Sequence, residues 1–340
     1  AAGTAGGLMK QGSGVLRLTG NSTYAGPTTV SAGTLRVDGD QSAATGAVTV
    51  AAGATLAGTG IVGGNTTIHS GATLSPGASP GTLSFTQGLT WASGANYNWQ
   101  MLNASGTAGT SGGWDLVSVT GTLSIGSTAV DPFRVNLWSL SSTGPDVNGN
   151  ALNFSATTSG TWRIATAAGG ITGFSADKFQ IVTGASNGTG GFTNSLSGGT
   201  FSLAQNGNEI DLVFTGPTTV SQGTLKLAVA DAAGSSAVTV AAGATLSVGP
   251  QVQAVVTSLT NNGQVDLGLG SLTVSTGQTA EGLVNQIMNG IVNGGTTGIT
   301  SSNAAPTGGA FTVGWMDNGD GSFTAAYAAA GDSNLDSVVD

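Results

Sequence analysis

Short glycine-containing turns alternate with stretches in which apolar and polar residues alternate, and this unit recurs along the first 84 residues. In Leu35-Arg36-Val37 and Val48-Thr49-Val50 the apolar residues lie two apart, so a strand there buries one face and exposes the other to water. The turn signal returns at Gly33-Thr34-Leu35, Gly53-Ala54-Thr55-Leu56, Gly71-Ala72-Thr73-Leu74 and Gly81-Thr82-Leu83. A supersecondary unit repeated at this spacing predicts an all-β solenoid, in which each turn stacks on the one before.

An internal duplication supports the solenoid. The stretch Gly26–Ser31 returns as Gly216–Ser221 with the same six residues, and Ala47–Leu56 returns unchanged as Ala237–Leu246. Both pairs share one offset, which a bias toward glycine, alanine and threonine rarely produces twice. We therefore expect residues 214–248 to be a second copy of the 24–58 stretch.

At these residues the chain resembles the autotransporter-associated β-strand repeat, also called the passenger-associated transport repeat, of large bacterial surface and secreted proteins. The resemblance is strongest over residues 12–37. Residues 114–123 and 162–174 are similar to segments that follow such repeats in planctomycete-type proteins. The resemblance implies a right-handed parallel β-helix carried outside the cell as a scaffold or adhesin.

Composition and charge narrow the function classes. Only 7% of the residues are charged, well below the average of about a quarter, while 39% are hydrophobic, which is too many for a disordered chain. The net charge of -9 comes without any Lys/Arg cluster, so nucleic acid and anionic lipid are poor partners. The absence of cysteine excludes disulfides and thiolate metal sites. No apolar run approaches the length of about 20 residues that membrane insertion requires.

Changes in composition along the chain predict five sections. The central part, residues 85–214, holds five of the six Trp and eight of the ten Phe, which indicates a wider core or a more elaborate set of loops. A helix is expected after an N-cap at Thr279, because apolar residues then recur at three- and four-residue spacing. A hairpin is expected around Asp317–Gly321. The sections are solenoid turns at 1–84, an aromatic-rich β section continuing the solenoid at 85–214, a second solenoid section at 215–275, a helix and hairpin cap at 276–330, and a tail at 331–340.

Candidates for catalysis are few. His69 is the single histidine and would need a partner within hydrogen-bonding distance to act as a base. Residues 77–81 and 184–188 both fit the Gly-x-Ser-x-Gly spelling of a nucleophile elbow, but neither lies between a strand and a helix as that motif requires. Residues 58–63 spell a dinucleotide fingerprint without the helix that should follow it. We interpret all three glycine motifs as turns and predict no catalytic residue.

Two other classes of site remain open. Some parallel β-helices are polysaccharide lyases that use acids with a Lys or Arg base, and the nearest candidates here are Asp115, Asp131 with Arg134, Asp177 with Lys178, and Glu209 with Asp211. The central tryptophans could form a sugar-stacking platform, although core packing is the preferred interpretation for large aromatic residues. These tryptophans are Trp91, Trp99, Trp114, Trp138 and Trp162.

The tail contains the most specific chemical pattern. Oxygen ligands stand at positions one, three, five and nine of a calcium loop, with a main-chain carbonyl at seven; these are Asp332, Asn334, Asp336, Asp340 and the carbonyl of Val338. The pattern resembles the first half of a dockerin-type loop. Ser337 stands at position six, where glycine makes the sharp turn, and the twelfth position lies beyond Asp340. The sequence therefore predicts Ca²⁺ binding once the loop is complete.

Together these patterns predict a non-enzymatic extracellular structural protein. Both ends of the sequence interrupt a motif, so we expect the chain to be part of a longer precursor whose open β-helix ends pair head-to-tail with other copies in a fibre. An adhesin that binds surface glycans through the tryptophan-rich centre is the first alternative. A polysaccharide-active enzyme is the second.

Overall fold

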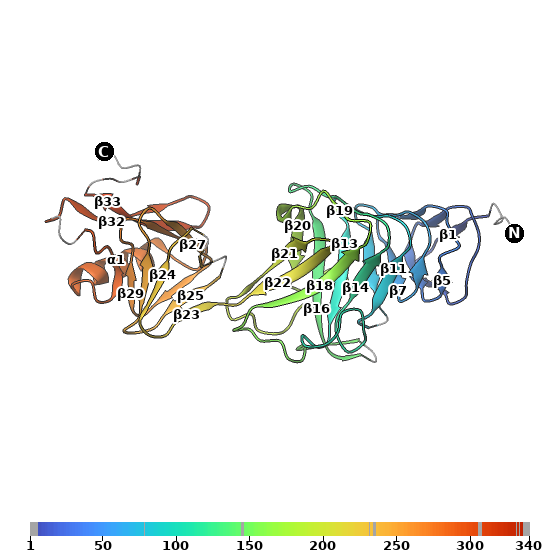
Figure 1. Ribbon diagram of the computed structural model, residues 1–340, viewed down its shortest axis with the longest axis horizontal. Helices are drawn as coiled ribbons and strands as arrows, with labels where there is room; N and C mark the ends of the chain where they lie inside the picture. Colours follow the sequence, from blue (N-terminus) through green and yellow to red (C-terminus); the bar gives the residue numbers. More distant parts are fainter. Residues whose placement is uncertain are drawn as a thin grey trace. The chain divides into compact units, whose positions relative to one another are not determined.

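The computed structural model describes residues 6–77, 79–143, 146–230, 232–233, 236–304, 308–330, 332 and 334–335. The chain forms two compact units. Unit 1 contains residues 1–155, 160–195 and 201–214, and unit 2 contains residues 156–159, 196–200 and 215–340. Both consist mostly of parallel strands stacked turn upon turn (Figure 1). The predicted parallel β-solenoid is confirmed.

Three sheets run along unit 1, and a turn contributes up to one strand to each. The first contains β1 (Leu8–Lys10), β3 (Thr28–Val30), β6 (Val48–Val50), β9 (Thr66–Ile68), β12 (Leu89–Ala92), β15 (Leu123–Gly126) and β19 (Ile171–Thr172). The second contains β2 (Val15–Leu18), β4 (Gly33–Val37), β7 (Ala54–Gly58), β10 (Thr73–Pro76), β13 (Asn96–Met101), β16 (Phe133–Thr143), β17 (Asp146–Asn148) and β20 (Phe179–Val182). The third contains β5 (Asp40–Gln41), β8 (Ile61–Val62), β11 (Thr82–Phe85), β14 (Leu116–Val119), β18 (Gly160–Ala167), β21 (Thr200–Asn206) and β22 (Glu209–Thr215). We call these sheets A, B and C.

The register between turns puts like residues above one another. In sheet B the inward column runs Leu16, Leu35, Leu56, Leu74, Tyr97 and Val135. Its members from Leu35 to Val135 are at most 1% exposed, whereas Leu16, in the first turn, is half-buried. Alternation in the sequence therefore becomes a continuous apolar column, because parallel pairing without a register shift keeps every second residue inside.

The turns lengthen along unit 1. One turn takes 20 residues from Leu8 to Thr28 and 48 residues from Leu123 to Ile171. The longer turns carry the aromatic residues: Trp91 stacks on Phe133 with ring centroids 4.6 Å apart and contacts Tyr97 at 5.7 Å. A second aromatic cluster joins Phe154, Trp162, Phe192, Phe201 and Phe214. The aromatic residues of this section thus form two clusters within the longer turns.

Antiparallel strands close two sheets of unit 1, a feature that the sequence reading did not anticipate. β17 pairs antiparallel with the end of β16, and β22 pairs antiparallel with β18. β21 is the outermost strand of sheet C. Residues 85–214 thus continue the solenoid and then end it with hairpins, so the expectation of a solenoid throughout this section was too simple.

Unit 2 repeats the architecture with thinner turns. Its three sheets contain β23 (Thr218–Val220), β25 (Val238–Val240) and β28 (Leu259–Asn261); β24 (Thr224–Leu227), β26 (Thr245–Val248), β29 (Gln264–Asp266) and β31 (Gly298–Thr300); and β27 (Gln253–Val256), β30 (Ser271–Val274), β33 (Phe323–Ala329) and β32 (Phe311–Asp317). The duplicated stretch behaves as predicted: Leu246 pairs with Leu225 as Leu56 pairs with Leu35. Val240 and Leu246 are 0% exposed, while Leu225 is half-buried.

The predicted helix is α1 (Ala280–Val292), and the Thr279 side chain accepts a hydrogen bond from Gly282 N at 3.0 Å as its N-cap. Leu283 and Ile287 are buried, but Met288, Ile291 and Val292 are 50%, 58% and 76% exposed, so half of the expected apolar face lies open. The helix fits closely over the last turn. A Cβ at Gly290 would lie 2.3 Å from the Ile299 carbonyl oxygen, so only glycine permits this approach.

The predicted hairpin is also present. β32 and β33 pair antiparallel around Asp317–Phe323, and β33 pairs antiparallel with β30. The hairpin covers this end of the third sheet of unit 2, in the section where the sequence predicts a helix and hairpin cap. No helix in the described part of the chain has the length and apolarity to cross a membrane.

Replacing Leu56 by alanine tests the inward column. The variant should lose about 2–5 kcal/mol of unfolding free energy, because it leaves a cavity between Leu35 and Leu74. Thr55→Ala is the matched control: its side chain lies on the opposite, partly exposed face of β7, and its effect should stay within about 0.5 kcal/mol. Chemical denaturation followed by circular dichroism measures both. Equal effects at the two positions would contradict the register.

Candidate functional site

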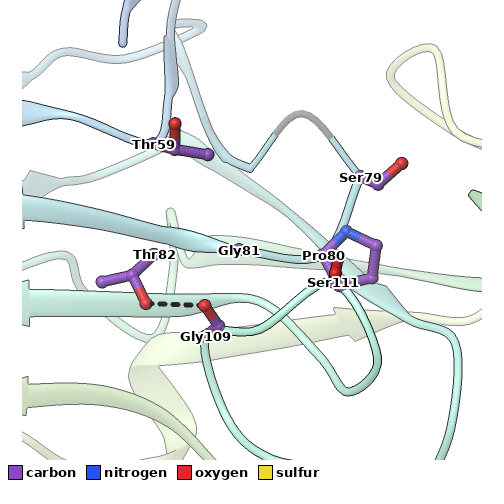
Figure 2. A pocket seen from close by; sticks show the side chains of 7 residues that line it. All are labelled: Thr59, Ser79, Pro80, Gly81, Thr82, Gly109 and Ser111. Carbon is purple, nitrogen blue, oxygen red and sulfur yellow. Dashed lines mark hydrogen bonds between the residues drawn. The ribbon is translucent and has the colours of Figure 1, made fainter. Parts of the chain in front are cut away.

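A cleft of about 460 Å³ opens in unit 1 beside the corner between β10 and β11. Its lining carries hydroxyl groups and no charge: Thr59, Ser79, Pro80, Gly81, Thr82, Gly109 and Ser111. Thr82 Oγ1 donates to the Gly109 carbonyl at 3.0 Å across the floor of the cleft (Figure 2). The lining alone can offer hydrogen bonds to a neutral polar molecule but holds no catalytic base.

A buried carboxyl group lies behind this cleft. Asp115 is 0% exposed, and its two oxygens accept hydrogen bonds from Gly81 N at 2.8 Å and Gln100 N at 2.9 Å. Burial raises the pKa of Asp115 well above its ordinary value, the two backbone N–H groups oppose this shift, and the charge of Asp146 adds to it. Asp115 thus ties the corner of one turn to β13 of the next.

A second carboxylate joins the same two segments. Ser79 Oγ donates to Asp146 Oδ1 at 2.7 Å, and Gln100 Nε2 donates to Asp146 Oδ2 at 2.8 Å. Ser79 and Gln100 are 7% and 6% exposed. Four polar groups from separate segments therefore gather in one place with little access to water. They are the hydroxyl group of Ser79, the carboxamide of Gln100 and the carboxyl groups of Asp115 and Asp146.

Ser79 has an unusual backbone. Its φ of 151° is one that residues with a side chain rarely adopt, and such outliers concentrate at sites with a function. Its hydroxyl group points away from Thr59 and Thr82 (Figure 2), consistent with its bond to Asp146. Ser79 belongs to the first Gly-x-Ser-x-Gly match, and strand β11 follows it. A strand thus stands where a nucleophile elbow would have its helix.

The other motifs in glycine-rich segments are also turns. Residues 58–63 run from the last residue of β7 through a two-residue turn into β8, and no helix follows. In the second Gly-x-Ser-x-Gly match, Ser186 Oγ donates to Asn136 Oδ1 at 3.0 Å, and Asn187 Nδ2 donates to Asn98 Oδ1 and to Thr73 Oγ1, each at 3.0 Å. This match therefore fastens a loop over the outer face of sheet B.

His69 and the predicted acid–base pairs do not form one site. His69 is exposed at the end of β9. The other candidates make separate local contacts. The backbone N–H of Asp131 donates to Thr128 Oγ1, Arg134 Nε donates to Gln180 Oε1, and Lys178 Nζ donates to the Gly173 carbonyl. Ser175 donates to Asp177, and Glu209 pairs with Arg163 at 2.8 Å. Burial and the nearby Glu209 raise the pKa of Asp211. The candidates are spread over β16, β22, the short 3-10 helix Ala176–Lys178 and loops, and the described contacts do not bring them together in one cleft.

Three of the five central tryptophans belong to the core. Trp91 and Trp99 are 0% exposed and Trp162 is 6% exposed, while Trp114 and Trp138 are half-buried. Trp99 Nε1 donates to the Asp115 carbonyl at 2.9 Å, and Trp162 Nε1 donates to the Ala104 carbonyl at 2.9 Å. Core packing, the preferred interpretation, is confirmed for the three buried rings, which cannot serve as a stacking platform.

The predicted calcium loop lies mostly outside the described residues. Of its ligands the structure describes Asp332, which is 7% exposed, and Asn334, which is exposed; Asp336, Val338 and Asp340 are not described. Among the described residues, no three His, Cys, Asp or Glu side chains gather closely enough to hold a metal ion. Calcium binding stays a prediction.

Sequence reasoning missed the Ser79–Gln100–Asp146 cluster. The hydrogen bonds join residues 67 and 46 positions apart, and no local motif links them. It also missed Asp38, which pairs with Arg17 of the preceding turn and with Arg36 at 2.8 Å. Partial burial alone would raise the pKa of Asp38, but hydrogen bonds from Arg36 and Arg17 outweigh it and lower the pKa. Arg17 and Arg36 occupy equivalent positions in successive turns, and this repetition in the sequence could have indicated that both contact the same acid.

Comparison with known proteins matches the passenger-associated-transport-repeat model at residues 8–37 and 197–227. The first match covers β1 to β4, and the second covers β21 to β24. A curated relative, the adhesin BmaC autotransporter of Brucella suis biovar 1 (strain 1330), is 54% identical over 74 residues, which are 22% of this chain and 2% of the adhesin. The chain thus carries passenger-type repeats and is similar over part of its length to an autotransporter adhesin.

Replacing Asp115 by asparagine tests the buried carboxyl group. The folded state binds a proton at Asp115 more tightly than the unfolded state, whose pKa is near the ordinary 3.8, so this contribution to stability is present at low pH and is lost as pH rises from 3.8 toward the raised pKa. The destabilisation caused by D115N should therefore be largest in acid and shrink as pH rises. Denaturant titrations at a series of pH values measure it, with the exposed Asp131→Asn as control. A destabilisation that grows with pH would contradict the assignment.

Proposed function

We propose that the protein is an extracellular structural protein, a β-solenoid scaffold that stacks head-to-tail with copies of itself. The passenger-type repeats support a place on the cell surface or outside the cell. The low charge and the repeated turns suit a scaffold whose core grows lengthwise. One observation supports the self-association: among the described residues, β1 and β2 each pair with another strand on one side.

The exposed edge belongs to β1 and β2. In the described part of the chain β1 pairs with β3 and β2 pairs with β4, and no further strand covers their outer sides. Met9 is 63% exposed and Val15 is 67% exposed. Leu16 is half-buried, although Leu35 and Leu56, the residues of the same column in the following turns, are fully buried. An apolar edge with unpaired backbone groups is a template for another strand.

The side chain of Lys10 restricts the part of this edge that can accept another strand to β2 and the outward-facing side of β1. Its ammonium group points to the column of Val30 and donates to the carbonyls of Gln11, Gly12 and Ala32 at 2.8, 2.7 and 2.9 Å. All three donors are used within the protein, so the charge closes the core at sheet A. A charge turned inward is one way in which edges avoid indiscriminate pairing, and it leaves β2 as the main docking strand.

The opposite surface of the contact would lie on unit 2 of another copy. There β31 and β32 are the outermost strands of their sheets, and Phe311 and Trp315 on β32 are 39% and 36% exposed. The two surfaces differ, so the contact is heterologous and propagates into a filament unless its rotation closes a ring.

An adhesin is the second candidate, and the outer face of sheet A favours it. Hydroxyl-bearing residues stand in register on successive strands, namely Thr29, Thr49, Thr67, Thr90, Ser124 and Thr172. A groove of about 340 Å³ crosses this face beside Asn65, Thr67 and Thr90. Hydroxyl and amide groups in a shallow groove suit hydrogen bonding to a surface glycan. This location replaces the tryptophan-rich centre of the original hypothesis.

Lysine at position 15 tests the stacking edge. The wild-type protein should form larger species as its concentration rises, with filaments visible by electron microscopy, because the edge of β2 pairs with another copy. Val15→Lys, combined with Met9→Lys, should shift the protein to monomer in sedimentation velocity, since charges on an edge strand oppose pairing. Val130→Lys is the matched control, because Val130 is 96% exposed in a loop. A wild-type protein that stays monomeric at high concentration would contradict the proposed self-association.

The adhesin is tested separately with a glycan array and the wild-type protein. We expect glycan binding to fall at least tenfold in the double variant Thr67→Ala with Thr90→Ala, because the groove lies at these residues. The control variant Thr29→Ala should leave binding unchanged. Equal loss at Thr29 or no glycan binding at all would contradict the groove.

A further inference from the structure

Asp146 holds two groups that can react with each other. Ser79 Oγ donates to one oxygen of its carboxylate at 2.7 Å, and Gln100 Nε2 donates to the other at 2.8 Å. The first group is an alcohol and the second is a carboxamide. Because both are bound to one carboxylate, the hydroxyl oxygen and the amide carbon are held in the same small volume, which is the main requirement for an intramolecular acyl transfer.

We propose that Ser79 and Gln100 join in an intramolecular ester cross-link. Ser79 Oγ attacks the side-chain carbonyl carbon of Gln100, a carbon–oxygen bond forms, and the carbon–nitrogen bond of the carboxamide breaks. Ammonia leaves to solvent, and the product is an ester between the corner after β10 and strand β13. The reaction occurs once per molecule and consumes no other reactant.

Asp146 can carry the proton through the whole step. Oδ1 accepts the proton of the Ser79 hydroxyl as the oxygen attacks, which is the role of the base beside an activated serine. Oδ2 lies at Gln100 Nε2 and returns a proton to the nitrogen as it leaves. Asp146 therefore ends in the state in which it began. The proton of Ser79 is carried away in the ammonia.

Trp138 is the cross-strand neighbour of Gln100, and its indole can stabilise the charge that develops on the carbonyl oxygen. Trp138 pairs in register with Gln100 across β13 and β16, so both side chains stand on the outer face of sheet B. In the described part of the chain Trp138 Nε1 is buried and has no hydrogen-bond acceptor. An unused N–H group beside a reacting carbonyl is the arrangement of an oxyanion hole.

The surroundings favour the ester over hydrolysis. Ser79 and Gln100 are 7% and 6% exposed, and Asp115 is 0% exposed, so little water competes with the hydroxyl group. The raised pKa of Asp115 favours its protonated form, which avoids a second negative charge beside Asp146. The unusual φ of Ser79 shows that the fold holds this residue in a conformation it would not choose alone.

Intact-mass spectrometry of the full chain under denaturing conditions is the primary test. The expected mass is lower than the sequence mass by one ammonia. Tandem mass spectrometry should locate a cross-linked peptide pair that contains Ser79 and Gln100, and hydroxylamine should cleave it as it cleaves esters. Succinimide formation at an Asn-Gly pair also releases ammonia, so the cross-linked peptide is the decisive observation.

Variants assign the roles. Ser79→Ala and Gln100→Leu should keep the full sequence mass, and Asp146→Asn should slow the loss of ammonia at least tenfold. Ser186→Ala is the matched control, because it removes the serine of the second Gly-x-Ser-x-Gly match and should leave the cross-link intact. A wild-type protein that keeps its full mass after prolonged incubation in the folded state would overturn the proposal, whatever the variants do. Ammonia loss that persists unchanged in Ser79→Ala would overturn it as well.

Discussion

The strict parallel register between successive turns is the constraint on which the rest of the structure depends. Many of the strands are short and would be unstable as isolated pairs. They are stable here because the backbone N–H and C=O groups of one turn form hydrogen bonds with those of the next. Because Leu35, Leu56 and Leu74 pair without a shift, the apolar residues form a column and the hydroxyl residues form another on the outside. A register shift by one residue would exchange these two faces along the whole sheet.

The repeat made much of this fold predictable. Alternation at Val48-Thr49-Val50, the unchanged copy at Val238-Thr239-Val240 and the N-cap at Thr279 are local signals, and each reports an element that the structure contains. The antiparallel hairpins were not predictable in the same way. β22 reads as a buried strand in either direction, and only its pairing with β18 decides that it reverses. The exposure of Ile291 and Val292 depends on what α1 packs against, which periodicity does not report.

The cluster behind the cleft could not be predicted from local sequence patterns. Asp115 and Asp146 were ordinary acids in the sequence, and Ser79 was part of a motif that glycine and serine produce by chance. Their relation arises because turns of unequal length bring the corner after β10, the strand β13 and the hairpin strand β17 together. The extra residues in the longer turns fall between strands, so the register is kept while side chains from distant segments meet outside the core.

The unequal turns also determine how the molecule would respond to a stretching force. In a solenoid each turn contacts only its neighbours, so a pull applied at β1 would detach the turns that follow it one at a time in chain order. An early turn of 20 residues, as from Leu8 to Thr28, would release about 70 Å of extended chain, whereas the turn of 48 residues from Leu123 to Ile171 would release about 170 Å. The first extensions would be short and the later ones long, so unit 1 would act as a tether whose compliance increases as it is drawn out.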